Sequence, residues 1–166
     1  LTGASGFIAG RIAEHLIQKG HILRCILRKE APEELLKRIP TAQFVVGSFL
    51  DDIFLKRSCE DIDVFVHFAG LAGTWGTRDS FWKANVEVTR QLAKAANESH
   101  IQRWIQLSSP SIYFEFNDQE NIDETFLPKA FSSFYAESKY EADRILFENK
   151  GFRTIALRPR FVLGKG

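Results

Sequence analysis

Short apolar segments alternate with amphipathic helical patterns along nearly the whole chain, and this alternation limits the folds open to it. The segment DVFVHFAG at residues 63–70 is an almost uninterrupted apolar run, which is typical of a parallel strand covered on both faces. Strands alternating with helices at this interval predict an α/β fold with a doubly wound parallel sheet. The other expected strands are residues 22–27, 42–49, 103–109 and 153–159, and the expected helices are residues 7–19, 32–38, 51–60, 81–99 and 134–150.

The length and composition suit one domain, which we expect to span residues 1–166. Apolar residues make up 45% of the chain, charged residues make up 26%, and the formal net charge is +1. A chain this close to neutral gives no reason to expect nucleic acid or an acidic membrane surface as a partner. We also see no run of about 18 apolar residues that would predict a membrane span.

The cysteines and histidines do not form a recognisable metal or disulfide pattern. Cys25 and Cys59 lie far apart without CxxC spacing, so we expect reduced thiols in a cytoplasmic protein. The four histidines lack ligand spacing, and we expect no metal. His67 interrupts an apolar strand, which favours a packed or hydrogen-bonded histidine.

A glycine turn opens the chain and leads directly into the first expected helix. In TGASGFIAG, Gly3 and Gly6 remove side chains where a backbone could approach a pyrophosphate, and Ala9 is small enough for close helix–strand packing. Glycine turns also cap helices without binding a ligand. Turns of this kind normally follow a buried strand, but only Leu1 precedes this one and the chain contains no Met. We therefore expect a fold truncated in its first strand, within a longer protein.

A tyrosine and a lysine lie four residues apart on the helix expected at residues 134–150, so both side chains share one face. A Lys139 ammonium beside Tyr135 favours the phenolate, so we expect the pKa of Tyr135 to lie below its usual value of about 10. Such a tyrosine exchanges a proton with a substrate hydroxyl or carbonyl. Ser109, at the end of the strand RWIQLSS, is placed to hydrogen-bond the same oxygen. The alternative is a chance YxxxK spacing on a solvated helix face.

Candidate site residues follow the carboxyl ends of the expected strands, where open parallel sheets bind their ligands. The connection of residues 110–133, which follows Ser109, exceeds the length of most structureless loops, and such loops tend to have a function. The residues at strand ends are Gly3 to Gly6, Arg28, Ser48, Ala69 and Ser109.

Six motifs in order across nearly the whole chain resemble those of the short-chain dehydrogenase/reductase superfamily. More narrowly, the chain resembles its extended NAD(P)-dependent epimerase/dehydratase family, which includes sugar-nucleotide epimerases and hydroxysteroid-dehydrogenase-like reductases. The motifs are TGASGFIAG, VFVHFAG, NVEVTRQLAKAA, QLSSPSIY, YAESK and IALRPRFVLGKG. The resemblance implies a Rossmann-type NAD(P)-binding domain without the C-terminal substrate domain of the family.

The resemblance also implies roles for individual residues. Tyr135 would be the general acid/base, and Lys139 would hold the nicotinamide ribose and tune the tyrosine. Ser109 would position the substrate oxygen, and it is favoured over Ser108 because the family's serine lies four residues before a tyrosine. Asn85 would support the site through its helix. The remaining residues implied to line the cofactor are Gly3, Ser5, Gly6, Phe7, Ile8, Ala69, Gly70 and Pro159, together with Tyr135 and Lys139.

Departures from the family pattern bear on the cofactor. The second strand ends in Arg28, where NAD-preferring relatives have an acidic residue. A guanidinium there forms charge-assisted bonds to a 2′-phosphate, so we expect NADP(H), with NAD as the other candidate. Alternatively, Arg28 is a solvated strand end. Ser48 and Phe49 replace the usual Asp-containing adenine contact, so we expect backbone groups and stacking on Phe49 to bind the base.

Aromatic residues bear on the substrate. Trp75 and the segment PSIYFEF at residues 110–116 indicate a bulky, fairly apolar substrate, or else they pack against a further domain. Arg160 occupies a position that is often glycine in the family, and its side chain would narrow the nicotinamide or substrate pocket.

The function that these expectations favour is oxidoreduction of a small molecule with a hydroxyl or ketone. A hydride would pass between nicotinamide and a carbinol or ketone carbon while Tyr135 handles the proton. One alternative is a sugar-nucleotide epimerase or dehydratase that uses the cofactor transiently, and another is a noncatalytic NADP(H)-binding module. The resemblance also suggests a homodimer.

Overall fold

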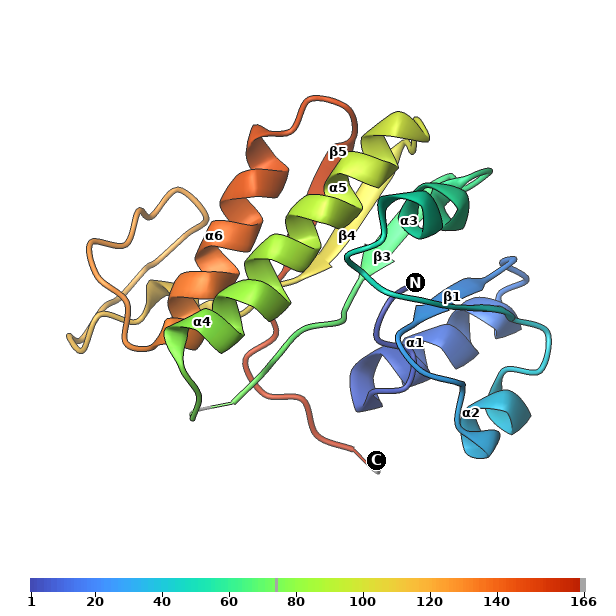
Figure 1. The fold of residues 1–166 in the computed structure, drawn as a ribbon. Helices are drawn as coiled ribbons and strands as arrows, with labels where there is room; N and C mark the ends of the chain where they lie inside the picture. The colour runs from blue at the N-terminus through green and yellow to red at the C-terminus, as the bar shows by residue number, and fades with distance from the viewer. Residues whose placement is uncertain (74, 165–166) are drawn as a thin grey trace.

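One parallel sheet runs through the middle of the molecule, which a computed structural model describes at residues 1–73 and 75–164 (Figure 1). The strands are β1 (Arg24–Leu27), β2 (Gln43–Val46), β3 (Val64–His67), β4 (Arg103–Leu107) and β5 (Arg153–Leu157). β1 pairs with β2, and β4 lies between β3 and β5, all in parallel. Thr2 joins the two groups because it bridges Ile26 of β1 and His67 of β3. The prediction of a doubly wound parallel sheet is confirmed, and residues 1–2 lie at its centre.

Helices cover both faces of the sheet. Ile26 of β1 packs with buried residues of α3, α5 and α6, whereas its neighbour Leu27 packs with α1 and α2. Consecutive strand residues point to opposite faces, so these two apolar clusters lie on opposite sides of the sheet. On the first side Trp104 of β4 stacks with Phe65 and Phe152, with ring centroids 4.5 and 5.4 Å away. These helices are α1 (Phe7–Gln18), α2 (Glu33–Arg38), α3 (Asp52–Cys59), α5 (Val88–Glu98) and α6 (Phe134–Glu148).

The helix predicted at residues 81–99 is a run of three segments. These are α4 (Arg78–Phe81), the π-helix η1 (Trp82–Glu87) and α5. The run begins earlier than predicted because the Thr77 hydroxyl accepts a hydrogen bond from the Ser80 amide and caps the first turn. Single π turns occur frequently at functional sites, and Asn85 lies in this one.

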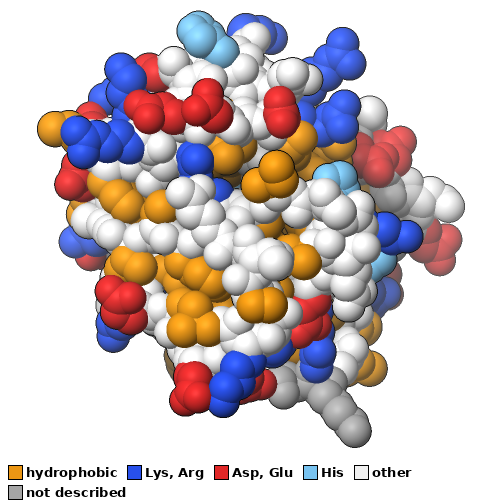
Figure 2. Space-filling view, turned by 90° about the vertical axis from the view of Figure 1, so that its right-hand side faces the viewer, with side chains coloured by type: hydrophobic (Ala, Val, Ile, Leu, Met, Phe, Trp, Pro, Cys, Tyr) orange, Lys and Arg blue, Asp and Glu red, His pale blue; other side chains and the backbone are white. Residues whose placement is uncertain are grey.

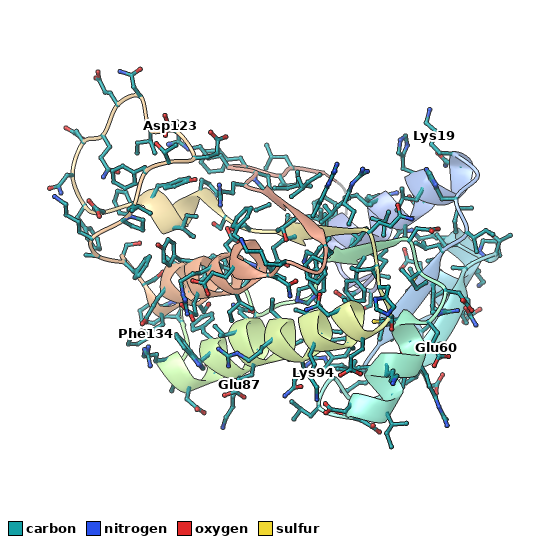
Figure 3. All side chains as sticks on the ribbon, turned by 90° about the horizontal axis from the view of Figure 1, so that it is seen from above. Lys19, Glu60, Glu87, Lys94, Asp123 and Phe134 are labelled. Carbon is teal, nitrogen blue, oxygen red and sulfur yellow. The ribbon has the colours of Figure 1, made fainter. Side chains whose placement is uncertain are left out.

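The connection between β4 and α6 begins with the 3₁₀ helix η2 (Pro110–Tyr113) and then projects from the body of the molecule, where Figure 3 labels Asp123. The Glu115 side chain accepts a hydrogen bond from the Ala130 amide at 3.3 Å, which ties the two arms of this projection together. α6 starts immediately afterwards, where the Ser133 hydroxyl caps it by accepting from the Ala136 amide.

The side of the molecule formed by β1, α1 and α2 shows hydrophobic side chains in its middle and mixed charges around its margins (Figure 2). Among the side chains described on this face, neither sign of charge forms a continuous patch. Within residues 1–73 and 75–164, no helix combines the length and the apolar character needed to span a bilayer.

Candidate active site

The glycine turn packs tightly against the loop that follows β3. Gly3 has a φ of 81°, and a Cβ added there would lie 2.8 Å from the Ala69 nitrogen and 2.9 Å from the Phe68 carbonyl carbon. Both contacts are to backbone atoms, so a side chain at this position is excluded unless the turn moves. The Gly6 amide donates to the Gly3 carbonyl at 2.8 Å and closes the turn.

The N-terminus of α1 follows this turn without a capping side chain. Gly6 occupies the N-cap position, and the first turn contains no acidic residue. The first amides of the helix therefore keep their hydrogen-bonding capacity and the positive end of the helix dipole is not neutralised. Ser5 and Gly6 are exposed beside them. This cradle fits a pyrophosphate group.

His67 connects the turn to the rest of the sheet. Its Nδ1 lies 2.6 Å from the Thr2 hydroxyl, and its Nε2 lies 3.2 Å from the Thr89 hydroxyl of α5. Burial lowers the pKa of His67 from 6.5 to about 3, and the nearby positive charge of Lys139 contributes to that shift. His67 is therefore a neutral, hydrogen-bonded core histidine, and the prediction of a packed or hydrogen-bonded histidine is confirmed.

Tyr135 and Lys139 point toward the carboxyl end of β4 from successive turns of α6, whose start Figure 3 marks at Phe134. The Lys139 side chain is 6% exposed, and its Nζ donates to the Leu107 carbonyl at 2.5 Å. Burial lowers the pKa of Lys139 to about 8, and the charge of Asp143 opposes that shift. The ammonium group is therefore held inside the protein at the last residue of β4.

The Tyr135 hydroxyl interacts with Ser109. Burial raises the pKa of Tyr135, while the interaction with the Ser109 hydroxyl lowers it by a smaller amount, so the pKa lies above 10.0. The prediction that Lys139 lowers this pKa is wrong for the structure, because the ammonium group donates to the Leu107 carbonyl and desolvation of the ring outweighs the hydrogen-bonding contribution.

The two consecutive serines face different partners. The Ser108 hydroxyl donates to Asp143 Oδ2 at 2.6 Å in the buried interior. Ser109 lies on the Tyr135 side, where its oxygen caps η2 by accepting from the Ser111 amide. The structure thus brings Ser109, and not Ser108, to the tyrosine, in agreement with the sequence-based choice between them.

Asn85 links the loop after β3 to the helix of Tyr135. Its Oδ1 accepts from the Leu71 amide at 2.7 Å, and its Nδ2 donates to the Leu71 carbonyl and to the Ser138 hydroxyl, both at 3.0 Å. Ser138 in turn donates to the Tyr135 carbonyl at 2.8 Å. A Cβ at Gly70 would lie 2.9 Å from Asn85 Oδ1, so glycine is required beside this amide. Asn85 thus binds the backbone of the loop after β3 and, through Ser138, the backbone of Tyr135. Ser138 is a partner that the sequence had not indicated.

A cavity of about 940 Å³ brings together the residues expected around the adenosine half of a cofactor. The Ser48 hydroxyl accepts from the Leu50 amide, and Phe49 is 6% exposed with its ring in the core. Little of the Phe49 surface is therefore available for stacking on a base, which disagrees with the stacking prediction. Arg28 is exposed at the cavity wall. The lining residues are Arg28, Gly47, Ser48, Phe49, Leu50, Ala69, Gly70, Leu71, Ser80, Lys83, Ala84, Glu87 and Val88.

The segment after β5 returns to the glycine turn. Pro159 is exposed at the end of β5, and a Cβ at Gly164 would lie 2.7 Å from the Phe7 ring. This places the segment that follows β5 beside the cradle. Arg160 lies over the Phe161 ring at 5.6 Å. The Ile8 side chain is half-buried at the start of α1.

Aromatic residues near the start of α6 line a second cavity of about 560 Å³. Trp75 is 91% exposed at its edge, and Phe131 and Phe134 also contribute. Phe81, another lining residue, packs edge-on against Tyr135 with ring centroids 6.0 Å apart. Of the aromatic residues expected to form a substrate lip, Trp75 lines this cavity next to the helix of Tyr135, whereas residues 110–116 do not.

Comparisons with known proteins agree with this geometry. Residues 1–166 match the sequence pattern described as the NAD dependent epimerase/dehydratase family. The chain is 31% identical over 170 residues to the protein YbjS of Escherichia coli strain K12, covering 99% of this chain and 50% of YbjS. It is 29% identical over 178 residues to a 3-beta-hydroxysteroid dehydrogenase of Mycolicibacterium neoaurum, covering 100% of this chain and 48% of that protein.

A solved structure shares the fold. UDP-glucuronic acid 4-epimerase from Bacillus cereus, in complex with UDP-glucuronic acid and NAD, superposes with a TM-score of 0.79 at 25% sequence identity. The match covers 95% of this chain and 54% of the epimerase. The chain thus spans about half the length of the relatives it matches. It belongs to the NAD-dependent epimerase/dehydratase family, a family of NAD(P)-dependent enzymes, as its motifs predicted.

Proposed function

We propose that the protein is an NAD(P)-dependent oxidoreductase that transfers a hydride between nicotinamide and a carbinol or ketone carbon. The observation that carries the proposal is the meeting of Ser109, Tyr135 and Lys139 at the carboxyl end of β4. In an open α/β sheet, ligands bind in the crevice at that end of the strands. The same edge holds the glycine turn, since Thr2 pairs with β3 beside it.

Tyr135 serves as the acid in the reductive direction. Its raised pKa keeps the hydroxyl protonated near neutral pH, which is the state that donates a proton to a carbonyl oxygen. The Ser109 hydroxyl donates a hydrogen bond to the same substrate oxygen and stabilises the charge that develops on it. A bound nicotinamide supplies the hydride. Lys139 would hold the ribose of that group and supply a buried positive charge there.

The glycine turn and the uncapped N-terminal end of helix α1 would hold the pyrophosphate, and the larger cavity would receive the adenosine half. We assign NADP(H) as the preferred cofactor because the Arg28 guanidinium is exposed at the wall of that cavity and binds a 2′-phosphate through charge-assisted bonds. Arg28→Asp weakens binding of NADPH by more than that of NADH in a fluorescence titration. Lys29→Asp is the matched control, because Lys29 is also exposed but is not among the residues that line the cavity. Equal losses for the two cofactors would remove Arg28 from cofactor selection.

The test of the reaction uses the full-length protein with NADPH or NADH and a panel of ketones that includes a ketosteroid. Tyr135→Phe lowers turnover by about 100-fold or more, the usual contribution of a general acid. Tyr140→Phe is the matched control, because Tyr140 lies on the same helix but packs against Phe131. Undiminished turnover in Tyr135→Phe would exclude the proposed chemistry. Binding of nicotinamide without turnover of any substrate would favour a noncatalytic module.

Epimerisation or dehydration of a sugar nucleotide is the second candidate. The fold similarity to the Bacillus cereus epimerase favours it, since that enzyme was solved with UDP-glucuronic acid and NAD. Such a reaction shares the Tyr135 step but regenerates the cofactor within each turnover. Conversion of a UDP-sugar without net consumption of NAD(P)H would select this candidate over a net reductase.

A further inference from the structure

A buried ion pair lies directly behind the proposed catalytic groups. Asp143 is 3% exposed and lies one helical turn after Lys139 on α6. Arg158 follows β5, and its Nη2 donates to Asp143 Oδ2 at 2.9 Å. The same carboxylate oxygen accepts from Ser108 at 2.6 Å, while Arg158 Nη1 donates to the Tyr113 hydroxyl at 2.8 Å. The pair thus joins α6, the ends of β4 and β5, and η2.

We propose that Asp143 and Arg158 are positioning residues for the reaction, which keep Lys139 charged and fix the turn that carries Ser109. This inference rests on the proposed function, because it assigns the pair a role in the same site. Neither residue needs to contact substrate or cofactor. Both act through groups they touch.

The location of the pair argues for a role beyond stability. Other arginine–carboxylate pairs, such as Arg78–Glu137 and Arg144–Glu141, lie at the surface with half-exposed arginines. Burying two charges costs free energy, and well-packed hydrophobic residues of similar volume would not incur this cost. Stability alone therefore does not account well for a buried ion pair at this place. The Asp143–Arg158 pair instead lies where four elements of the site converge.

The first role concerns the charge of Lys139. Its hydrogen-bond partner, the Leu107 carbonyl, is neutral, and burial favours loss of the proton. The charged and titratable groups facing Lys139 are Asp143 on its own helix, neutral His67 on β3, Tyr135 one turn earlier and Arg158 beyond Asp143. Asp143 supplies the negative charge that opposes deprotonation. Burial raises the pKa of Asp143 overall, and the hydrogen bonds from Ser108 and Arg158 oppose that rise and so help to keep the carboxylate ionised.

The second role concerns the geometry of the serine turn. The turn runs from Ser109 through η2 to Tyr113, and the pair binds the residue just before it and the last residue in it. Asp143 holds Ser108 just before the turn, and Arg158 holds the Tyr113 hydroxyl at its close, with the guanidinium 5.3 Å from the centre of the ring. Because Ser108 is drawn inward, Ser109 faces Tyr135. The pair therefore sets the distance between the two hydroxyls that share the substrate oxygen.

Two substitutions in the full-length protein test the first role. Asp143→Asn keeps the shape and the acceptor for Ser108 but removes the charge, and Arg158→Met leaves Asp143 without its cationic partner. In Asp143→Asn we expect the pKa of Lys139 to fall by about one unit or more, and in Arg158→Met we expect the pKa of Asp143 to rise, both measured by NMR of isotope-labelled side chains. In Asp143→Asn the alkaline limb of the kcat profile in the reductive direction moves to lower pH, because the Asp143 charge that raises the pKa of both Lys139 and Tyr135 is gone. Arg144→Met, which breaks surface pairs on the same helix, leaves both measurements unchanged.

Tyr113→Phe tests the second role without disturbing a charge. It removes the hydroxyl that accepts from Arg158, so the fold is retained even if the charge variants fail to fold. We expect kcat to fall about tenfold while the KM for the cofactor stays within twofold, since misplacing a catalytic group acts on the chemical step. An unchanged Lys139 pKa in folded Asp143→Asn, or an unchanged kcat in Tyr113→Phe, overturns the corresponding role. The NMR measurement needs no substrate, so it tests the coupling of Asp143 to Lys139 independently of the proposed function. If Tyr135→Phe keeps full turnover, the proposed function is refuted. A lower Lys139 pKa in Asp143→Asn would still support the electrostatic coupling.

Discussion

Replacing Gly3 by alanine separates two reasons why the turn at residues 3–6 requires glycine. The φ of 81° at Gly3 is in the left-handed region, which costs a residue with a Cβ about 1 to 2 kcal/mol. The new methyl group would also lie 2.8 Å from the Ala69 nitrogen, a backbone atom that cannot rotate away. Overpacking of this kind typically adds about 1 to 3 kcal/mol. We therefore expect Gly3→Ala to lower the free energy of unfolding by about 2 to 5 kcal/mol.

Gly20→Ala provides the matched control. Gly20 has a φ of 83°, but a methyl group added there meets no heavy atom within 4 Å, so its substitution measures the backbone cost alone, about 1 to 2 kcal/mol. Urea unfolding followed by the fluorescence of buried Trp104 reports both values. Gly3→Ala should also weaken NADPH binding at least about tenfold by shifting the turn, while Gly20→Ala leaves it unchanged. Equal losses of stability in the two variants, with cofactor binding intact, would refute the close-approach argument.

Three further substitutions test the packing around the site. Burial lowers the pKa of His67 from 6.5 to about 3, so between these two pH values His67 is protonated in the unfolded state but neutral in the folded state. The stability this group contributes is complete above pH 6.5 and falls as the pH drops toward 3, by about 2 kcal/mol near pH 5, and His67→Gln should remove that part of the slope in unfolding experiments. Leu146→Ala, at a fully buried position, should cost about 2 to 5 kcal/mol, against about 0.5 kcal/mol for half-exposed Phe147→Ala on the same helix. Ser133→Ala removes the cap on the Ala136 amide and should lower the thermal midpoint, for a loss of about 1 kcal/mol.

The architecture was predictable because it depends on local periodicity. Alternating strands and helices, the glycine turn and the shared helix face of Tyr135 and Lys139 are properties of short stretches of sequence, and the structure reproduces them. The helix around Asn85 was predicted as a regular helix, but its first part is a π-helix. Hydrophobic spacing alone does not distinguish these two forms over six residues.

The electrostatics of the site were not predictable in the same way. The pKa of Tyr135 depends on its burial and on where the lysine ammonium donates its hydrogen bond, and both are set by packing between α6 and β4. Phe49 looked available to a base, yet its ring belongs to the core. Asp143 does carry a signal, since it follows Lys139 by four residues on the same helix face, but its partner Arg158 comes from another element. Spacing along one helix says nothing about such a partner.

The hydrogen bonds of His67 determine which of its nitrogens carries the proton. The Thr89 hydroxyl donates to the Asn85 carbonyl at 2.6 Å, so toward His67 it can only accept, and Nε2 must be the donor. Nδ1 is then the acceptor in the neutral ring and accepts a hydrogen bond from the Thr2 hydroxyl, whose oxygen accepts in turn from the Ala69 amide. Each hydrogen bond in this set therefore has one possible donor and one possible acceptor, and exchanging them in any bond leaves a buried polar group without a partner. Because the Asn85 side chain also binds Ser138, which donates to the Tyr135 carbonyl, oriented hydrogen bonds connect the glycine turn to the helix of Tyr135, and a shift at one end costs free energy along this network.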